Sequence, residues 1–532
     1  MCNREKPKNP WYITTAIPYV NARPHIGFAL EILLADALAR YHRLKGYDVR
    51  FLTGTDDNSL KNVQAARELG VSTAELVERN SRAFEALRET LALSFDDFIR
   101  TSADVRHIAG VEKLWRACAA SGDVYKKAYA GLYCVGCEQF YAEQELEDGR
   151  CPEHGTRPEL VEEDNYFFRL SKYQERLEGL VDSDELRIVP QSRKNEVLSF
   201  IRSGLADFSI SRSRGRSEGW GIGVPDDPGQ VMYVWFDALA NYVTALDYAE
   251  EGALYTQFWV NNPRRTHVIG KGIVRFHAVY WPAMLLSAQI PPPSTILVHG
   301  YLTVEGRKIS KSFGNAIDPA DWAARFGTDA LRYYLLGHVR ADDDADVSLR
   351  SFVDAYNAHL ANQLGNLVNR LATMLDRYCE GVVPPALSRD EEARPLETIA
   401  RKLPRRLDDA AALFSTSGGL AAIWELIGEA NRYVVRVRPW ELARAPDANA
   451  QARLRLETAL YNLAETLRLV AYFLAPFLPQ AAAVIECRFE PRDEDRREAA
   501  SRWGALRPGT RFRLGPALFP RIDLSSSGQQ GN

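Results

Sequence analysis

An alternation of strand and helix patterns near the start of the chain constrains the fold more than any other feature. Residues 11–15 are aromatic or β-branched, which predicts a strand. Apolar residues at helical spacing follow from Ile26 to Tyr41, and Gly46 predicts the end of that helix. A second strand at 49–52 and a second helix at about 60–69 repeat the pattern. This succession predicts a βαβ unit and hence an α/β domain with a parallel sheet.

The same pattern is interrupted and then resumes. Between about 118 and 230, cysteines, glycines, prolines and mixed strand signals indicate an insertion into the α/β domain. Strands of the parallel type return at 266–269 and 295–298, each with a glycine within the next two residues. From about 352 to 488 nearly every segment has helical periodicity, which predicts a helix bundle.

Charge and composition limit the possible partners and locations. The 532 residues carry a formal net charge of -4, so a nucleic-acid partner must be met by local basic patches. The candidate basic residues are Arg401, Lys402, Arg405, Arg406, Arg432, Arg436 and Arg438. The alternative is that they form solvated helix faces. The chain shows neither a secretory signal nor a stretch of ~20 apolar residues, so we expect a cytoplasmic protein without membrane contact.

Four potential metal ligands occur in two closely spaced pairs. Cys134 and Cys137 are followed after 13 residues by Cys151 and His154. Paired thiolate and imidazole ligands suit tetrahedral zinc. Because the set leaves no open position for a substrate, it predicts a structural Zn²⁺ site that stabilises a small inserted module.

Two segments have the character of phosphate sites. His25 and Gly27 lie between the first strand and its helix, where backbone amides and the helix dipole favour an anion. The segment 306–315 contains two lysines and two serines between glycines, which predicts a cationic loop able to neutralise a leaving pyrophosphate. Taken singly, the first could be an ordinary helix cap and the second a basic surface turn.

Together these motifs resemble those of a known family. His25-Ile26-Gly27-Phe28 is similar to the H-I-G-H element of class I aminoacyl-tRNA synthetases, and residues 308–312 are similar to their K-M-S-K-S loop. The zinc knuckle, residues 233–238 and residues 438–440 narrow the resemblance to the methionyl-tRNA synthetases, over about residues 11 to 485. The resemblance implies ATP-dependent formation of methionyl-adenylate and transfer of methionine to the 3′ end of a tRNA with a CAU anticodon. It also implies Mg²⁺ with ATP and a monomeric protein.

The family fold implies a doubly wound, Rossmann-type parallel sheet with an inserted zinc-knuckle connective domain, followed by an all-α anticodon-binding bundle. The expected parts are residues 1–117 (first half of the catalytic domain), 118–232 (connective insertion), 233–325 (second half with the lysine loop), 326–355 (linking segment), 356–523 (anticodon-binding domain) and 524–532 (disordered tail).

The resemblance also assigns site residues. The catalytic residues expected are His25, Lys308 and Lys311. The ATP-binding residues expected are His25, Gly27, Gly270, Lys308, Ser310, Lys311 and Ser312. The methionine-binding residues expected are Ala16, Ile17, Tyr19, Asp56, Trp235, Tyr242 and His277, and the anticodon-binding residues are Asn366, Arg370 and Trp440. From the residues alone, the spacing of Trp235 and Tyr242 on one helical face favours core packing, and Trp440 could be a packed helix-start residue.

Three positions depart from the family, all on the ATP side. Phe28 replaces the second histidine of H-I-G-H, Asn58 replaces another histidine, and Gly272 replaces a carboxylate expected near the ribose. Loss of one preorganised donor typically costs ~10²–10³ in rate. The alternatives to a working ligase are therefore an inactive or altered paralogue that binds tRNA or methionine, and an adenylate-forming enzyme with a non-tRNA acceptor.

Overall fold

The computed structural model separates the chain into two compact units, Met1–Glu89 with Leu93–Tyr301, and Thr90–Ala92 with Leu302–Asn532. The residues described are 9–134, 139–141, 143–152, 155–309, 315–387, 390–444, 450–490 and 501–523.

The first unit is built on a six-stranded sheet whose neighbouring strands are all parallel. In spatial order its strands are β3 (Asp97–Arg100), β2 (Asp48–Thr55), β1 (Pro10–Thr15), β12 (Arg265–Gly270), β13 (Thr295–His299) and β7 (Arg187–Val189). The chain moves outward from β1 in one direction and later from β12 in the other. This reversal confirms the doubly wound sheet and sets a switch point between β1 and β12.

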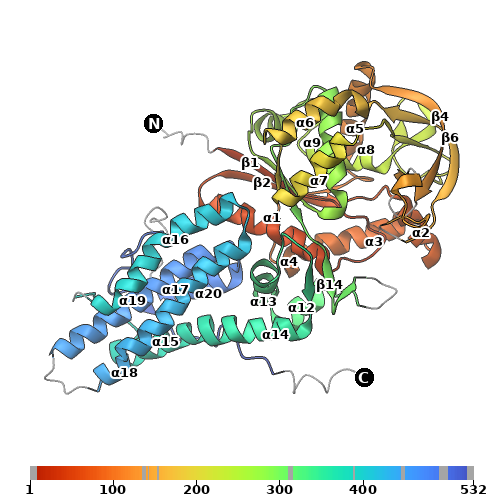
Figure 1. Ribbon diagram of the computed structural model, residues 1–532. Coiled ribbons are helices and arrows are strands. Elements are labelled where there is room, and N and C mark those ends of the chain that lie inside the picture. The colour runs from red at the N-terminus through yellow and green to blue at the C-terminus, as the bar shows by residue number, and fades with distance from the viewer. Residues whose placement is uncertain are drawn as a thin grey trace. The chain divides into compact units, whose positions relative to one another are not determined.

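Helices pack on both sides of this sheet (Figure 1). The helices of the first half are α1 (Ile26–Leu44), α2 (Leu60–Leu69), α3 (Thr73–Glu85), α4 (Leu87–Thr90) and α5 (Val105–Ala120). Ser59, Ser72 and Asp104 cap α2, α3 and α5 by accepting a backbone N–H at each helix start. The later helices are α6 (Gln174–Asp182), α7 (Gln191–Arg202), α8 (Val234–Leu239), α9 (Asn241–Thr244), α10 (Ala253–Tyr255) and α11 (Trp281–Ser287).

Antiparallel strands occupy much of the segment between α5 and α8. The long strands β4 (Val124–Cys134) and β6 (Glu159–Phe168) pair along their length and are visible at the edge of the first unit in Figure 1. The shorter strands are β5 (Gln139–Tyr141), β8 (Phe208–Ser209), β9 (Ser211–Ser213), β10 (Gly223–Val224) and β11 (Asp227–Met232). The edge strand β7 also comes from this segment, so the region expected to be an insertion contributes to the parallel sheet.

The second unit is predominantly helical. Its helices are α12 (Pro319–Phe326), α13 (Thr328–Tyr333), α14 (Leu349–Ala355), α15 (Asn366–Cys379), α16 (Arg394–Ala412), α17 (Thr416–Val437), α18 (Pro439–Leu442), α19 (Ala450–Leu474) and α20 (Pro479–Cys487). Its strands are β14 (Leu302–Val304), β15 (Arg307–Lys308), β16 (Ala345–Val347), β17 (Phe489–Glu490) and β18 (Arg511–Phe512). The predicted helix bundle is thus confirmed.

Buried charged side chains tie this second unit together. Arg332 is fully buried and donates to the carbonyl oxygens of Leu91, Pro476 and Phe477 at 2.7–3.2 Å. Glu465, also fully buried, accepts from three successive backbone N–H groups at 504–506 and so holds the final segment on α19. A buried charge of this kind is stable only when its partners are in place.

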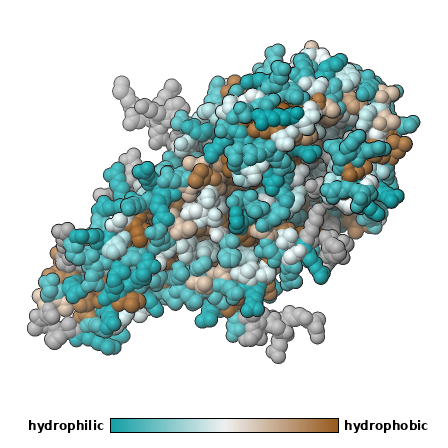
Figure 2. Space-filling model, in the orientation of Figure 1, coloured by the Kyte–Doolittle hydropathy of each residue, from teal (hydrophilic) through white to brown (hydrophobic). Residues whose placement is uncertain are grey.

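The visible surface is mainly hydrophilic, with apolar side chains in small scattered groups (Figure 2). Among the described helices, none combines the length and the apolar character needed to cross a membrane.

Candidate functional site

The ends of four parallel strands define the place where a ligand would bind. In an open α/β sheet, ligands bind beyond the carboxyl ends of the strands at the switch point. Here β1 ends at Thr15, β12 at Gly270 and β13 at His299, while β2 leads directly into Asp56. We call this region of the first unit the switch-point crevice.

His25 sits at the N-terminus of α1, on the β1 side of the crevice. Its Nδ1 accepts the Gly27 N–H at 3.1 Å, so the side chain caps its own helix. A Cβ at Gly27 would come within 2.9 Å of the His25 ring, which explains the glycine. Desolvation by the surrounding chain lowers the pKa of His25, although much of the residue is exposed. The neutral ring therefore carries its proton on Nε2, which is suited to donate to an anion.

Phe28 lies one turn further along α1 and faces the protein interior. Its ring packs edge-to-face on Phe84 of α3, with centroids 5.0 Å apart. Both side chains are buried. The position that lacks the family's histidine is therefore filled by an apolar contact within the core.

Two functional candidates escaped the sequence analysis. Glu31 of α1 accepts the Ala16 N–H with one carboxylate oxygen at 2.9 Å, and its other oxygen lies 2.9 Å from Nε2 of His299. Both side chains are largely buried. Glu31 thus links the ends of β1 and β13 across the base of the crevice. A carboxylate within the otherwise apolar stretch 26–35 was the sequence signal that could have identified it.

The predicted methionine residues on the β2 side lie close together. Asp56 is buried, and its backbone N–H donates to the Pro18 carbonyl at 2.9 Å, beside Tyr19. The rings of Tyr19 and Trp235 are 6.4 Å apart. Trp235 is only partly buried and stacks on Phe276 with centroids 3.9 Å apart, a partner that the sequence analysis missed. A buried carboxylate beside aromatic walls suits a ligand with an ammonium group and an apolar side chain.

Tyr242 and His277 continue this aromatic series. His277 Nδ1 lies 2.9 Å from the Ile273 carbonyl oxygen, which can only accept, so Nδ1 carries the proton. Its Nε2 therefore accepts from the Tyr242 hydroxyl at 2.7 Å. Burial lowers the pKa of His277 to about 4, which keeps the ring neutral. The edge of His277 meets Trp235 at 6.2 Å, so Tyr19, Trp235, His277 and Tyr242 form a continuous row.

The remaining two predicted methionine residues lie at the end of β1. Ala16 and Ile17 directly follow β1 and pack as partly buried residues against the main apolar core. All seven predicted methionine residues thus fall within the first unit. Tyr242 is fully buried and is at once a core residue and the partner of His277.

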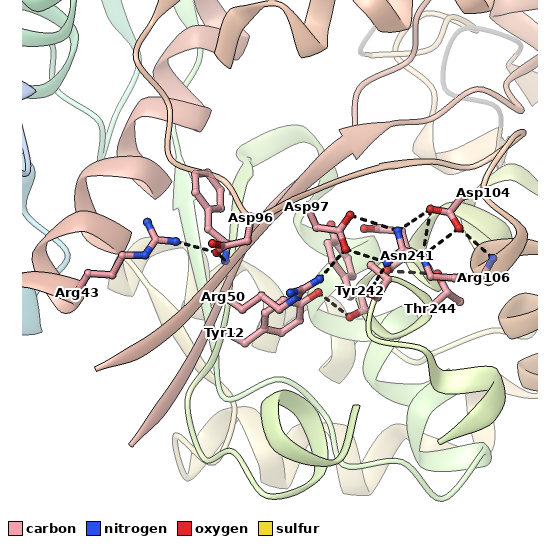
Figure 3. A network of polar contacts seen from close by, with 12 residues as sticks. Tyr12, Arg43, Arg50, Asp96, Asp97, Asp104, Arg106, Asn241, Tyr242 and Thr244 are labelled. Atoms are coloured by element: carbon pink, nitrogen blue, oxygen red, sulfur yellow. Dashed lines mark hydrogen bonds and ion pairs between the residues drawn. The ribbon is translucent and has the colours of Figure 1, made fainter. Parts of the chain in front are cut away.

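A polar network that includes residues of α9 holds Tyr242 in position (Figure 3). The hydroxyl of Tyr12 in β1 donates to the Tyr242 carbonyl at 2.9 Å. Arg106 of α5 donates both to Asp97 of β3 and to the Ala245 carbonyl, at 2.9 and 3.1 Å. Asp97 also forms an ion pair with Arg50 of β2 at 2.7 Å, as the dashed lines in Figure 3 show. Three strands and a helix therefore fix the turn that carries Tyr242.

Asn58, the second departure from the family, belongs to another buried network. Its amide donates to Asp237 of α8 at 2.7 Å. The second oxygen of Asp237 lies 2.5 Å from Nε2 of His107 in α5, whose Nδ1 is 2.9 Å from the Thr244 hydroxyl. The Asn58 backbone N–H also donates to Asp56 at 3.2 Å. Asn58 thus connects the Asp237–His107 pair to the carboxylate on the methionine side.

The predicted lysine loop is only partly described. Lys308 is the last residue of β15, which pairs with β14 in the second unit. Ser310, Lys311 and Ser312 lie outside the described residues. Gly270, another predicted ATP residue, ends β12. A Cβ built on Gly270 would lie 3.5 Å from the His299 ring.

The predicted zinc ligands are also partly described. Cys134 ends β4, and Cys151 lies across from it in a small buried cluster with Tyr141. The Cys151 N–H donates to the Thr156 carbonyl at 2.8 Å, and the Gly155 N–H donates to the Cys151 carbonyl at 2.7 Å. Cys137 and His154 fall outside the described residues, and within the described part of the chain no group of three potential ligands occurs.

The predicted anticodon residues lie in the second unit. Asn366 and Arg370 are exposed on the first two turns of α15, and Trp440 is 38 % exposed in α18. Asn431 of α17 donates to the Gln363 carbonyl at 3.3 Å, which fixes α17 beside the turn before α15. Trp440 follows the end of α17 through Arg438.

Most of the basic residues noted in the sequence have carboxylate partners. Arg401 pairs with Glu397, Arg406 with Glu425, and Arg438 with Glu441. Arg432 and Arg436 share the largely buried Glu429. Those five arginines therefore form local ion pairs, which reduces the positive field that they can offer to a nucleic acid.

Comparisons with known proteins cover nearly the whole chain. The family model described as "tRNA synthetases class I (M)" matches residues 11–157 and 143–372. The model described as "Anticodon binding domain of methionyl tRNA ligase" matches residues 389–529.

Individual relatives agree with these matches. A methionine–tRNA ligase of Brucella suis is 44% identical over 532 residues, covering 98% of each chain. One of Caldanaerobacter subterraneus is 41% identical over 518 residues, covering 97% of this chain and 80% of that protein. The solved structure of Mycobacterium tuberculosis methionyl-tRNA synthetase in complex with methionyl-adenylate superposes with a TM-score of 0.91 at 42% identity, covering 96% of this chain and 100% of that chain.

Proposed function

The chain belongs to the methionyl-tRNA synthetases of class I, and we propose that it joins methionine to tRNA at the switch-point crevice with the residues described above. The observation that carries this proposal is the pairing of two different half-sites beyond the carboxyl ends of the central strands. A buried carboxylate follows β2 beside a row of aromatic side chains that reaches β12, and a histidine-capped helix start follows β1. The first suits an amino acid and the second an anionic phosphate.

Methionine would be held by three kinds of contact. Asp56 pairs with its ammonium group, and Trp235 and Tyr19 enclose its thioether. The hydrogen bond from Tyr242 to the neutral His277 fixes the shape of the pocket floor. The carboxylate of the amino acid is then left to point towards the N-terminus of α1.

The reaction has two steps and requires no covalent enzyme intermediate. The methionine carboxylate attacks the α-phosphorus of ATP, which forms methionyl-adenylate and releases pyrophosphate. A hydroxyl of the terminal tRNA ribose then attacks the adenylate carbonyl and releases AMP. Catalysis rests on positioning and on stabilising charge in the transition state. His25 Nε2 and the amides of α1 serve the phosphates, while Lys308 and Lys311 serve the pyrophosphate. Mg²⁺ bound with ATP would neutralise part of the triphosphate charge.

Methionine-dependent exchange of labelled pyrophosphate into ATP tests the first step. We expect exchange that requires methionine and is lost in Lys311→Ala. A Lys127→Ala variant, which removes a lysine of β4, is a matched control that should retain exchange. Absence of exchange in the native protein would contradict adenylation and favour a paralogue that only binds tRNA or methionine.

Aminoacylation tests the second step and the acceptor. Stacking of a base on an aromatic side chain contributes about 1–3 kcal/mol, so Trp440→Ala should lower charging of methionine tRNA about 5- to 100-fold. Because Trp440 belongs to the tRNA half of the reaction, the same variant should keep pyrophosphate exchange. Exchange without any charging of tRNA would instead indicate an adenylate-forming enzyme with another acceptor.

We also propose that Cys134, Cys137, Cys151 and His154 hold a structural Zn²⁺. Supporting this are the burial of Cys134 and Cys151 in one small cluster and the tight hydrogen-bonded turn at 151–156. When bound, the metal would supply folding energy to a segment with little core of its own. One equivalent of zinc by elemental analysis, lost in Cys151→Ser, would support the proposal, whereas a zinc-free native protein would refute it.

A further inference from the structure

Gly272 and Tyr301 make an unusually close approach in the first unit. A Cβ built on Gly272 would lie 1.8 Å from the Tyr301 hydroxyl oxygen and 3.1 Å from Cζ. The hydroxyl therefore occupies the volume that any side chain at position 272 would require. The ammonium of Lys271 lies over the Tyr301 ring, 4.7 Å from its centroid. This cation–π contact favours one orientation of the ring, with its hydroxyl held at Gly272.

Both residues stand at the mouth of the switch-point crevice. Gly270 of β12 and His299 of β13 are paired strand ends. Gly272 follows the first by two residues and Tyr301 follows the second by two residues. A glycine and a tyrosine hydroxyl are therefore presented together beyond the carboxyl ends of neighbouring strands, where the fold places ligands.

The positions of the other half-sites indicate which part of the nucleotide reaches this pair. Among the predicted amino-acid contacts, Asp56 and Tyr19 pair just beyond the end of β2, and Tyr242 packs on His267 of β12. The N-terminus of α1 lies close after the end of β1. Since the methionine carboxylate must meet the α-phosphorus, that phosphorus belongs over the switch point. The sugar attached to it then extends away from the ammonium site at Asp56, towards the ends of β12 and β13.

We propose that the Tyr301 hydroxyl binds a ribose hydroxyl of ATP and is a specificity-determining group for the nucleotide in this chain. The inference rests on the proposed function and adds a residue to it. A phenolic hydroxyl both donates and accepts a hydrogen bond, whereas a carboxylate only accepts. Tyr301 thus binds the sugar through its neutral hydroxyl group, which occupies the space that a side chain at position 272 would need.

Removal of one hydroxyl tests this assignment. Calorimetry measures the binding of ATP, 2′-deoxy-ATP and 3′-deoxy-ATP to the native protein and to Tyr301→Phe. A neutral hydrogen bond corresponds to roughly a three- to tenfold change in affinity. We expect the native protein to bind ATP more tightly than one deoxy analogue by about that factor, and Tyr301→Phe to bind the two equally. Tyr248→Phe is the matched control, because Tyr248 also carries a lysine, Lys113, over its ring, 4.8 Å from its centroid.

A second pair of variants separates a ribose contact from a packing effect. Gly272→Ala should displace the Tyr301 hydroxyl and weaken ATP binding. Gly272→Ala combined with Tyr301→Phe should relieve the crowding and recover ATP binding, but without discrimination between ATP and the deoxy analogue. Retained discrimination in Tyr301→Phe, or a native protein that binds ATP and both deoxy analogues equally, would overturn the inference.

Binding and turnover distinguish this inference from the proposed function. If the native protein discriminates between the sugars in calorimetry yet shows no methionine-dependent pyrophosphate exchange, the Tyr301 assignment stands and adenylation fails. If exchange occurs but Tyr301→Phe leaves the preference for ATP unchanged, adenylation stands and the Tyr301 assignment fails. A native protein that binds no ATP contradicts both.

Discussion

Among the residues predicted to bind methionine, hereafter the methionine side, the polar atoms of Tyr242 and His277 are held by specific hydrogen-bond partners. Tyr242 donates to His277, His277 donates to Ile273, and the backbone of Tyr242 accepts from Tyr12. At the positions that the family resemblance assigns to ATP, hereafter the nucleotide side, an apolar contact and a neutral hydroxyl stand where a histidine and a carboxylate are expected. Phe28 packs on Phe84, and Tyr301 fills the space at Gly272.

This contrast indicates that the two half-sites tolerate change differently. A pocket that selects one amino acid depends on fixed hydrogen bonds and shape, and each missing partner leaves a buried polar group unsatisfied. A nucleotide has a ribose, a base and three phosphates, so its binding is distributed over many contacts. Loss of one contact there can be offset by another, as we propose for Tyr301. Glu31 joins the two sides, since it binds Ala16 and His299 at once.

The largest effect should come from Asp56 on the methionine side. Removal of one partner of a buried charge pair typically costs about 3–5 kcal/mol. Asp56→Asn should therefore lower kcat/KM for methionine by roughly 10²- to 5 × 10³-fold in pyrophosphate exchange, while KM for ATP changes little.

Asp57→Asn is the matched control for this variant. The Asp57 carboxylate accepts hydrogen bonds from the hydroxyls of Thr55, Ser81 and Ser102 and is buried within the protein. Loss of this carboxylate should lower the melting temperature and should change the KM for methionine little. Equal kinetic losses in both variants would remove the distinction between a ligand contact and a structural carboxylate.

Sequence reasoning reached the fold and the family, because both depend on local patterns. The predicted strand at 11–15 is β1, and the predicted helix at 60–69 is α2. The reversal between β1 and β12 followed from the resemblance and is confirmed. The individual site assignments stay predictions, although the methionine residues do lie together.

Contacts between residues distant in the sequence could not be foreseen. Glu31 and His299 are 268 positions apart, and Asn58 and Asp237 are 179 apart. Neither pair can be inferred from hydrophobic periodicity, because periodicity indicates only which residues share a face of one helix or strand. Position 28 is instructive for the same reason. The sequence shows that a donor is missing, but only the packing on Phe84 shows that this side chain points into the core.

A smaller effect is expected on the pH dependence of the free energy of unfolding, through His277 on the methionine side. The pKa of His277 is lowered from 6.5 to about 4 by burial. As pH falls below 6.5, the unfolded chain takes up a proton that the folded chain does not bind until about pH 4. The free energy of unfolding should therefore decrease by on the order of 3 kcal/mol as the pH falls across this window. Above pH 6.5 the contribution of His277 to stability should be fully present.

The variant His277→Gln isolates this contribution. Denaturant unfolding at a series of pH values should show a shallower loss of stability between pH 6.5 and 4 than in the native protein. His267 has a pKa lowered in the same direction by burial, so part of the slope remains in the variant. Parallel curves for the two proteins would mean that His277 is not held neutral, and the rigid pocket floor would lose its support.

The smallest effect, and the one that bears most directly on the nucleotide side, is expected from Phe28→His. If the missing histidine were simply a lost catalytic donor, its return should raise the rate of adenylation ~10²-fold or more. The packing on Phe84 predicts a different outcome, because an imidazole at this position would be buried without an identified partner. We expect a loss of about 1–3 kcal/mol in the free energy of unfolding and less than a threefold change in pyrophosphate exchange. Phe28→Leu, which stays apolar, controls for the change of shape. A large gain in exchange would show that the nucleotide side has lost a donor without replacement, whereas unchanged exchange would show that its chemistry no longer depends on position 28.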